Sequence, residues 1–211
     1  MTKKDEAIIP GPAGPLTSLP GRPAHTYFED RFDQQIEMVW TGHAPLDVPQ
    51  TPPGYELRQF QPGDGAAYED LFHLAFEDRG ALEHTRATAL DGGFFVVEHM
   101  ETGRLVATCA AQHVENERHP GGGQLGWLVG DPSHSGVRLG MIVSAAVTNR
   151  LAAAGYALPY LQTNDFRFAA IAIYLKLGWR PYLFAEDMEP RWRDVYAGLG
   201  RSLTPNEGVL P

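Results

Sequence analysis

Glycines and a proline follow an apolar stretch in segment 131–140, which reads Asp-Pro-Ser-His-Ser-Gly-Val-Arg-Leu-Gly. The preceding segment 124–130 predicts a strand that stops at Pro132, which cannot donate to a sheet ladder. A helix is predicted from about Val137 to a stop at Gly155, because apolar residues recur at helical spacing: Leu139, Ile142, Val143, Ala146, Val147 and Leu151. Such a turn exposes unpaired N–H groups and the positive end of a helix dipole. We therefore expect it to bind a phosphorylated cofactor, although glycines at a strand-helix junction also serve tight packing or a cap.

A second block, 161–181, carries another strand and another helix. The helix is predicted over 167–177 and ends at Gly178, with Trp179 starting a further strand. Tyr174 lies on this helix and supplies a phenol. Asn164 and Arg167 come just before the helix or at its start, where a polar side chain can contact a ligand or cap the helix.

The two blocks resemble motifs of the GNAT family of acyl-coenzyme A-dependent N-acyltransferases. The family's central motif is a strand, a proline and then Arg/Gln-x-x-Gly-x-Gly/Ala at a helix start. Here Pro132 is followed in the same register by 135–140, with Ser135 in place of the Arg or Gln and Arg138 in place of the first motif glycine.

The later motif of the family is Asn-x-x-Ala-x-x-x-Tyr followed by Leu-Gly-Phe. Arg167 occupies the Asn position, Trp179 replaces the Phe, and four residues match: Ala170, Tyr174, Leu177 and Gly178. The resemblance covers about residues 54–184 and is strongest to the mycothiol-synthase-like branch.

The resemblance implies that acetyl-coenzyme A is held between two splayed strands and at the helix start. Pantetheine amides would pair with the strand edge, and the pyrophosphate would meet the N–H groups of 136–141. Arg138 would either crowd the pyrophosphate or pair with it. The implied cofactor residues are Leu128, Val129, Gly130, Ser135, Gly136, Val137, Arg138, Leu139, Gly140, Met141, Asn164 and Arg167.

Direct acyl transfer to an amine needs a proton donor for the leaving thiolate and a base for the amine. By resemblance Tyr174 is the general acid, while the alternative is a tyrosine packed in the core with its hydroxyl satisfied. The strand offers Gln124 where the family often has a glutamate. Glu115 and His134 are the best substitutes for the base, with Asp165 behind them, although the residue types favour a solvated surface position for each of the three.

Four residues alternate along the end of the strand predicted over 105–114 and the turn after it: His113, Glu115, Glu117 and His119. If extended they would share one face and could hold a metal, but alternating polar residues more commonly mark the wet face of a strand. We therefore expect no metal. Cys109 lies in an apolar run and is expected to pack in the core.

Composition narrows the classes of function. The 211-residue chain has a net charge of −9 and a pI near 5.3, which argues against a nucleic-acid binder. It has no apolar stretch long enough to cross a membrane, and its one cysteine suits a reducing compartment, so a cytoplasmic protein is expected.

The first part of the chain is predicted to be an arm. Prolines cluster at Pro10 to Pro23 and at Pro45 to Pro53. Between them, Phe28, Phe32, Ile36 and Val39 or Trp40 recur at helical spacing, which predicts an amphipathic helix. This helix would pack on its own domain or, alternatively, form a dimerisation arm. The expected division is arm 1–53, acyltransferase domain 54–184, and C-terminal helix and tail 185–211.

The remaining pattern predicts an α+β domain of the GNAT fold, with a mixed, largely antiparallel sheet flanked by helices. Strands are expected from Tyr55, over 94–98, 105–114 and 158–163. Asp64 is expected to cap the helix that carries Tyr68, Phe72 and Phe76, a second helix spans 82–90, and a last helical stripe follows Met188.

The expected activity is transfer of an acetyl or related acyl group from acetyl-coenzyme A to a small-molecule or peptide amine. One alternative is a catalytically weak acyl-coenzyme A-binding module, since the glycine motif and the usual glutamate are both altered. A phosphate-binding regulatory domain paired through its proline-rich arm is the third possibility, and a homodimer is compatible with each.

Overall fold

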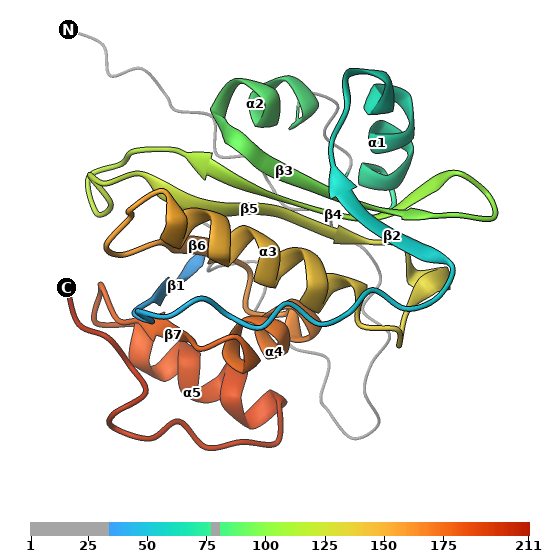
Figure 1. Ribbon diagram of the computed structural model, residues 1–211. Coiled ribbons are helices and arrows are strands. Elements are labelled where there is room, and N and C mark those ends of the chain that lie inside the picture. Colours follow the sequence, from blue (N-terminus) through green and yellow to red (C-terminus); the bar gives the residue numbers. More distant parts are fainter. Residues whose placement is uncertain (1–33, 77–80) are drawn as a thin grey trace, which may run out of the picture.

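The computed structural model describes residues 34–76 and 81–211 (Figure 1). The strands are β1 Ile36–Trp40, β2 Tyr55–Gln59, β3 Ala89–His99, β4 Arg104–His113, β5 Gly123–Gly130, β6 Tyr160–Thr163 and β7 Trp179–Tyr182. The α-helices are α1 Gly65–Phe72, α2 Ala81–Thr88, α3 Leu139–Ala153, α4 Phe168–Lys176 and α5 Met188–Gly198. Short 3-10 turns, η2 Pro62–Asp64 and η3 Pro132–His134, precede α1 and α3.

The strands form one seven-stranded sheet in the order β2-β3-β4-β5-β6-β1-β7. All neighbours are antiparallel except β5 and β6, which run parallel. The sheet is therefore mixed and largely antiparallel, and the α+β prediction is confirmed. The β3–β4 hairpin predicted at 101–104 is also present.

Helices cover both faces of this sheet (Figure 1). One face packs against α1 and α2 through a cluster built on Tyr68, Phe72 and Val96. The other face packs against α3, α4 and α5 through a larger cluster that includes Ile142 and Trp192. This two-sided burial explains why the stripes predicted on α3 and α5 are apolar.

Residues 36–40 form an interior strand of the sheet, so the predicted amphipathic helix is wrong over this stretch. All five residues of β1 are buried, and the strand lies between β6 and β7, antiparallel to both. Because both faces of the strand are covered, its sequence is mostly apolar and lacks the alternation of apolar and polar residues that a half-exposed strand shows. The earlier helix positions, Phe28 and Phe32, lie outside the described residues. β1 thus adds a strand to the sheet of the unit predicted over 54–184.

The segment between β1 and β2 contains no helix or strand and runs along α3 (Figure 1). Asn149 on α3 anchors it with two hydrogen bonds, accepting from the Leu46 N–H at 2.7 Å and donating to the Leu46 carbonyl at 2.9 Å. The side-chain amide thereby replaces the regular backbone partners that a proline-rich segment lacks.

Two local expectations are corrected. Asp64 stands at the N-cap of α1 but makes no side-chain cap bond there. Its carboxylate instead accepts from the Gln61 N–H and from Arg58, whose guanidinium lies 2.7 Å away. The helix predicted from about Val137 begins at Leu139, because Gly136 and Arg138 both have positive φ.

Candidate functional site

β5 and β6 separate shortly after they begin. These parallel neighbours share one register pair, Gln124 with Tyr160, whereas β5 pairs along its length with β4 on its other side. The facing edges beyond this pair, which include Leu128, Val129 and Gly130, are not laddered to one another. Backbone N–H and C=O groups left open in this way can pair with the amides of an extended ligand.

A β-bulge lies at the point of separation. Two residue steps on β4, from Thr108 to Ala110, face three on β5, from Val129 to Gly126. Trp127 takes up the extra residue with φ +56, a backbone region that disfavours a bulky side chain. Its indole packs against Phe72 and Phe76 beside α1, at centroid distances of 5.3 and 5.6 Å. The bulge therefore builds an aromatic wall on the α1 face; sequence reasoning did not single out Trp127, because nothing local marks a bulge there.

The loop after β5 is shaped by Asp131 and Gly136. The Asp131 carboxylate accepts hydrogen bonds from the N–H and hydroxyl of Ser133, which lower its pKa below the ordinary value against the raising effect of burial. Gly136 then turns the chain with φ +84 in open space.

The head of α3 presents a run of open amides. No described residue accepts a hydrogen bond from the N–H groups of Gly136 through Met141, and the next amide, of Ile142, bonds to the Arg138 carbonyl at 3.1 Å. Arg138 is the N-cap, exposed and left-handed with φ +66. The amides and the dipole of a fifteen-residue helix make this a strong site for an anion.

Close packing fixes α3 against α4. A Cβ on Gly140 would lie 2.9 Å from the Ile173 Cδ1 atom. This motif glycine therefore permits the approach of the two helices, while Gly136 provides the turn.

Tyr174 is buried on α4, facing the larger core cluster, with its ring 6.4 Å from that of Trp179. Burial raises the pKa of its phenol well above the ordinary value, the Cys109 sulfur adds to this, and the charge of Arg167 opposes it. The phenol consequently keeps its proton at neutral pH, as a proton donor must.

The proposed bases do not gather around Tyr174. Glu115 lies exposed in the β4–β5 hairpin, 3.7 Å from His113, and His134 bonds to the Tyr55 hydroxyl at 2.9 Å. They flank opposite ends of β5, which spans about 26 Å, so they cannot both reach one reacting centre. Asp165 is held by Arg191 at 2.6 Å. Asn164 is buried at the end of β6, where its side-chain oxygen accepts from Gln35 at 3.3 Å.

A buried ionic cluster joins β1 to the β4–β5 hairpin. The carboxylate of Glu37, wholly buried, accepts from His119 at 2.7 Å, from Arg118 and from Gln162 at 2.9 Å. Burial acts to raise the pKa of Glu37, but these hydrogen bonds outweigh it and hold the pKa below the ordinary value. Sequence reasoning missed this cluster because it predicted an amphipathic helix over the stretch that contains Glu37.

This cluster also corrects the expectation that His113 and His119 lie on one solvent-exposed face of a strand. His119 is 4% exposed and stacks on Tyr160 with ring centroids 3.9 Å apart, whereas His113 is exposed at the end of β4. The two histidines therefore do not share an extended face. Over residues 34–76 and 81–211, no group of three or more His, Cys, Asp or Glu side chains is placed to hold a metal ion.

Cys109 is fully buried, and burial raises the pKa of its thiol, so its core role is confirmed. The helices of the described part of the chain are each too short or too polar to cross a membrane.

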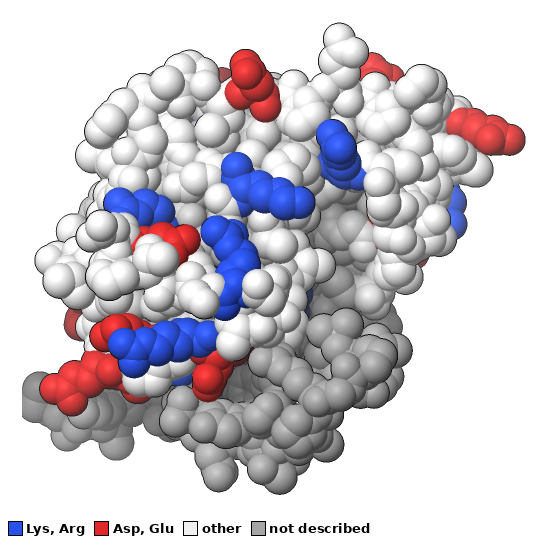
Figure 2. Space-filling view, turned by 90° about the horizontal axis from the view of Figure 1, so that it is seen from below, with Lys and Arg blue, Asp and Glu red and all other residues white. Residues whose placement is uncertain are grey.

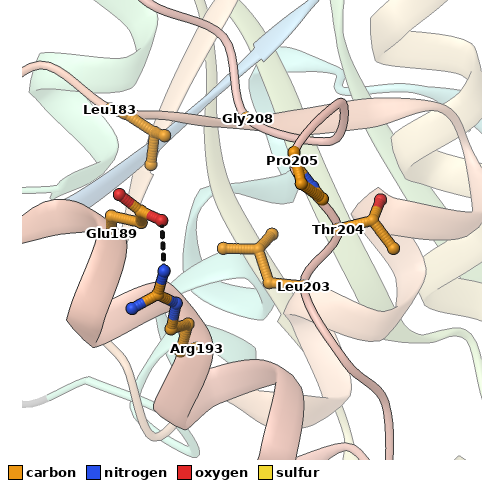
Figure 3. Close-up of a pocket in the computed structure, with 7 residues that line it drawn as sticks. All are labelled: Leu183, Glu189, Arg193, Leu203, Thr204, Pro205 and Gly208. Atoms are coloured by element: carbon orange, nitrogen blue, oxygen red, sulfur yellow. Dashed lines mark hydrogen bonds and ion pairs between the residues drawn. The ribbon is translucent and has the colours of Figure 1, made fainter.

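A shallow pocket lies elsewhere, between the end of β7, α5 and the C-terminal tail (Figure 3). Its volume of about 90 Å³ is far below that of ordinary cofactor sites. Glu189 and Arg193 in its wall pair with each other at 2.6 Å. Figure 2 shows the side of the molecule seen from below Figure 1, where Lys and Arg side chains lie scattered and some sit directly beside Asp or Glu. These charges thus partly satisfy one another.

The described residues form an α+β domain with an open strand pair, and comparisons with known proteins show which proteins share this fold. No family model matches the chain. A mycothiol acetyltransferase from Sanguibacter keddieii is 31% identical over 166 residues, which cover 68% of this chain and 52% of that protein, so the chain spans about half the length of this relative.

Solved structures share the fold. A GCN5-related N-acetyltransferase from Sphaerobacter thermophilus matches with a TM-score of 0.54 and 21% identity, over 70% of this chain and 49% of that one. A tandem GNAT protein from the clavulanic acid biosynthesis pathway matches with a TM-score of 0.52 and 20% identity, over 78% and 58%. The chain therefore has the GNAT fold.

Proposed function

We propose that this protein is an N-acyltransferase that moves an acetyl or related acyl group from acetyl-coenzyme A to an amine by direct attack. The observation that carries the proposal is the open β5–β6 edge, which leads to the amides of Gly136 through Met141 that have no partner among the described residues. A ligand with both peptide-like amides and phosphates fits this pairing of groups. The relative named as an acetyltransferase supports the same reaction class.

The residues present fit this acyl carrier. The amides at the head of α3 would hold the pyrophosphate, and Leu128, Val129 and Gly130 would pair with the pantetheine arm. Arg138 is exposed at the N-cap, so its side chain is free to turn toward a phosphate without displacing core atoms. Ser135 and Asn164 would complete the set at either side of the opening.

The chain's own contribution to the chemistry is orientation and a proton. Tyr174 would donate its phenolic proton to the sulfur as the C–S bond breaks and the amine nitrogen bonds to the acyl carbon. The amine must lose a proton to solvent or to a base, for which Glu115 and His134 remain predictions. Acyl transfer of this kind needs no covalent enzyme intermediate.

The proposal also covers the acceptor and the location of the protein. The acceptor is a small-molecule or peptide amine, and the sequence identity to the mycothiol acetyltransferase favours the mycothiol-synthase-like branch of the GNAT family. We also propose a cytoplasmic protein that can form a homodimer.

A catalytically weak acyl-coenzyme A-binding module is the second candidate. The observation that favours it is the absence of a carboxylate on β5, where Gln124 stands at the start of the strand. Such a module would bind the carrier through the same amides but release little thiol.

Two measurements test the proposal. Acetyl-coenzyme A at a hundredfold excess over its Kd should stabilise the protein by about 2.7 kcal/mol in a thermal unfolding assay. Thiol release with a panel of amines then separates an enzyme from a binding module.

Tyr174→Phe removes the proton donor and should lower kcat roughly 100-fold while leaving carrier binding unchanged. Tyr156→Phe is the matched control, because that hydroxyl bonds to His113 at the far end of α3. No stabilisation by the carrier would refute both candidates, and wild-type kcat in Tyr174→Phe would remove the general-acid role.

A further inference from the structure

The guanidinium of Arg167 crosses from the β6 side of the opening to the α1 side. Arg167 is the N-cap residue of α4, directly after β6. Its Cζ atom lies 4.4 Å from the ring centroid of Phe76, which follows α1 and packs against Trp127 of the β5 bulge. The charge therefore lies against the aromatic wall beyond the separated strands.

This cation has no counter-ion among the described residues. Three other arginines, which range from the exposed Arg118 to the buried Arg191, each pair with a carboxylate: Arg58 with Asp64, Arg118 with Glu37, and Arg191 with Asp165. For Arg167 the described chain provides neither a salt bridge nor a hydrogen-bond acceptor, and burial lowers its pKa. Asp165, two residues away, is already engaged. A partly buried guanidinium with its donors open is suited to a bidentate anion.

Arg167 is also close enough to Tyr174 to affect its titration, since the positive charge acts to lower the pKa of the phenol. An anion held by Arg167 would thus lie near the group that we propose protonates the leaving sulfur. The open amides of α3 form a separate anion site, because α3 packs on the opposite face of the sheet from α1 and Phe76. The position of Arg167 consequently fits the acceptor better than the carrier's phosphates.

We propose that Arg167 binds an anionic group, a carboxylate or phosphate, on the amine that accepts the acyl group. This inference depends on the proposed acyltransferase function and narrows its substrate to amines that carry a negative charge close to the nucleophile. The contact with the Phe76 ring holds the guanidinium in place, and two of its N–H groups can then face one anion.

The test compares matched acceptors. Amino acids are assayed beside their amides, and phosphoethanolamine beside ethanolamine, by thiol release from acetyl-coenzyme A. We expect a higher kcat/KM for the anionic member of at least one pair, and the pair that shows it distinguishes carboxylate from phosphate. Arg167→Gln should cut that kcat/KM roughly 10- to 100-fold, chiefly through KM, and should leave the neutral member unchanged. Arg167→Lys should restore part of the preference for the anionic acceptor, since lysine keeps the positive charge but lacks the paired N–H donors of the planar guanidinium.

Arg193→Gln is the control, because that exposed arginine pairs with Glu189 on α5. A direct readout is the Arg167 side-chain Nε–H NMR signal, titrated with N-acetylglycine and with inorganic phosphate. A shift with either supports the proposal.

The outcomes distinguish failure of the Arg167 anion site from failure of the proposed acyltransferase function. Thiol release that is equal for charged and neutral acceptors, or lost equally for both in Arg167→Gln, would overturn the anion site and leave the acyltransferase intact. An unmoved Arg167 signal with both anions would also overturn it. Weaker carrier affinity in Arg167→Gln would assign the guanidinium to the carrier instead. No carrier binding by the wild type would instead refute the proposed function.

Discussion

Gly136 offers the sharpest test of the loop that heads α3. Its φ of +84 is a region that an alanine enters at a cost of about 1–2 kcal/mol, while a Cβ there would meet no atom within 4 Å. Gly136→Ala should therefore act through backbone strain alone. Part of the cost is offset by the smaller entropy of the unfolded chain, so we expect a net loss of about 1 kcal/mol and a fall in Tm of about 2–4 °C.

The effect on carrier binding should be larger than the effect on stability. If alanine relaxes the strain by turning the local peptide, at least one amide no longer points at the pyrophosphate. A charge-assisted hydrogen bond contributes about 1.5–3 kcal/mol, so the Kd for acetyl-coenzyme A should rise at least about tenfold. Calorimetric titration measures this directly.

Two glycines serve as controls. Gly103 in the β3–β4 hairpin also has positive φ, +67, and open space, so Gly103→Ala should lose similar stability with an unchanged Kd. Gly121 in the β4–β5 hairpin has open space and no positive φ, so Gly121→Ala should change stability little. A Gly136→Ala protein that loses stability like Gly103→Ala but keeps the wild-type Kd would refute the argument that these amides bind the carrier.

Two further predictions concern the buried groups. Glu37→Gln should lower the free energy of unfolding by roughly 2–3 kcal/mol at pH 7, measured by urea denaturation. The folded pKa of Glu37 is below the ordinary value of 4.5, so its stabilising contribution is present above pH 4.5 and disappears as the pH falls through the folded pKa. This part of the pH dependence of stability should be absent in Glu37→Gln. An identical pH profile for the two proteins would contradict the prediction. The buried Cys109 thiol, whose pKa is raised by burial, should react with a thiol reagent only as fast as the protein unfolds, and rapid labelling of the native protein would show that the strand is accessible.

Local patterns predicted most of the fold. The stripe on α3, the β3–β4 hairpin and the last helix each carry their own signal within a few residues, since helices and hairpins are made of near contacts. β1 has no such signal. In five residues a strand buried on both faces is indistinguishable from a helical stripe, and its partners are remote, with Gln162 contacting Glu37 across 125 positions.

The candidate site also has features that local sequence predicts and features that it does not. The turn at Gly136 and the helix of Tyr174 follow from spacing, because a strand-helix junction is a local feature. The bulge at Trp127, the Glu37 cluster and the position of Arg167 over Phe76 depend on how separate elements are packed. The sequence pattern therefore predicted where a phosphate would bind, but it did not predict which residues would surround the acceptor.

The place of β1 has a consequence for biosynthesis. It is the first described strand to leave the ribosome, whereas its neighbours β6 and β7 are the last two described strands in chain order. At ordinary elongation rates the nascent chain waits on the order of ten seconds before Trp179 can pair with Trp40. During that interval Ile36, Met38 and Val39 have no neighbouring strand to cover them, so the sheet cannot be completed until β6 and β7 have been synthesised.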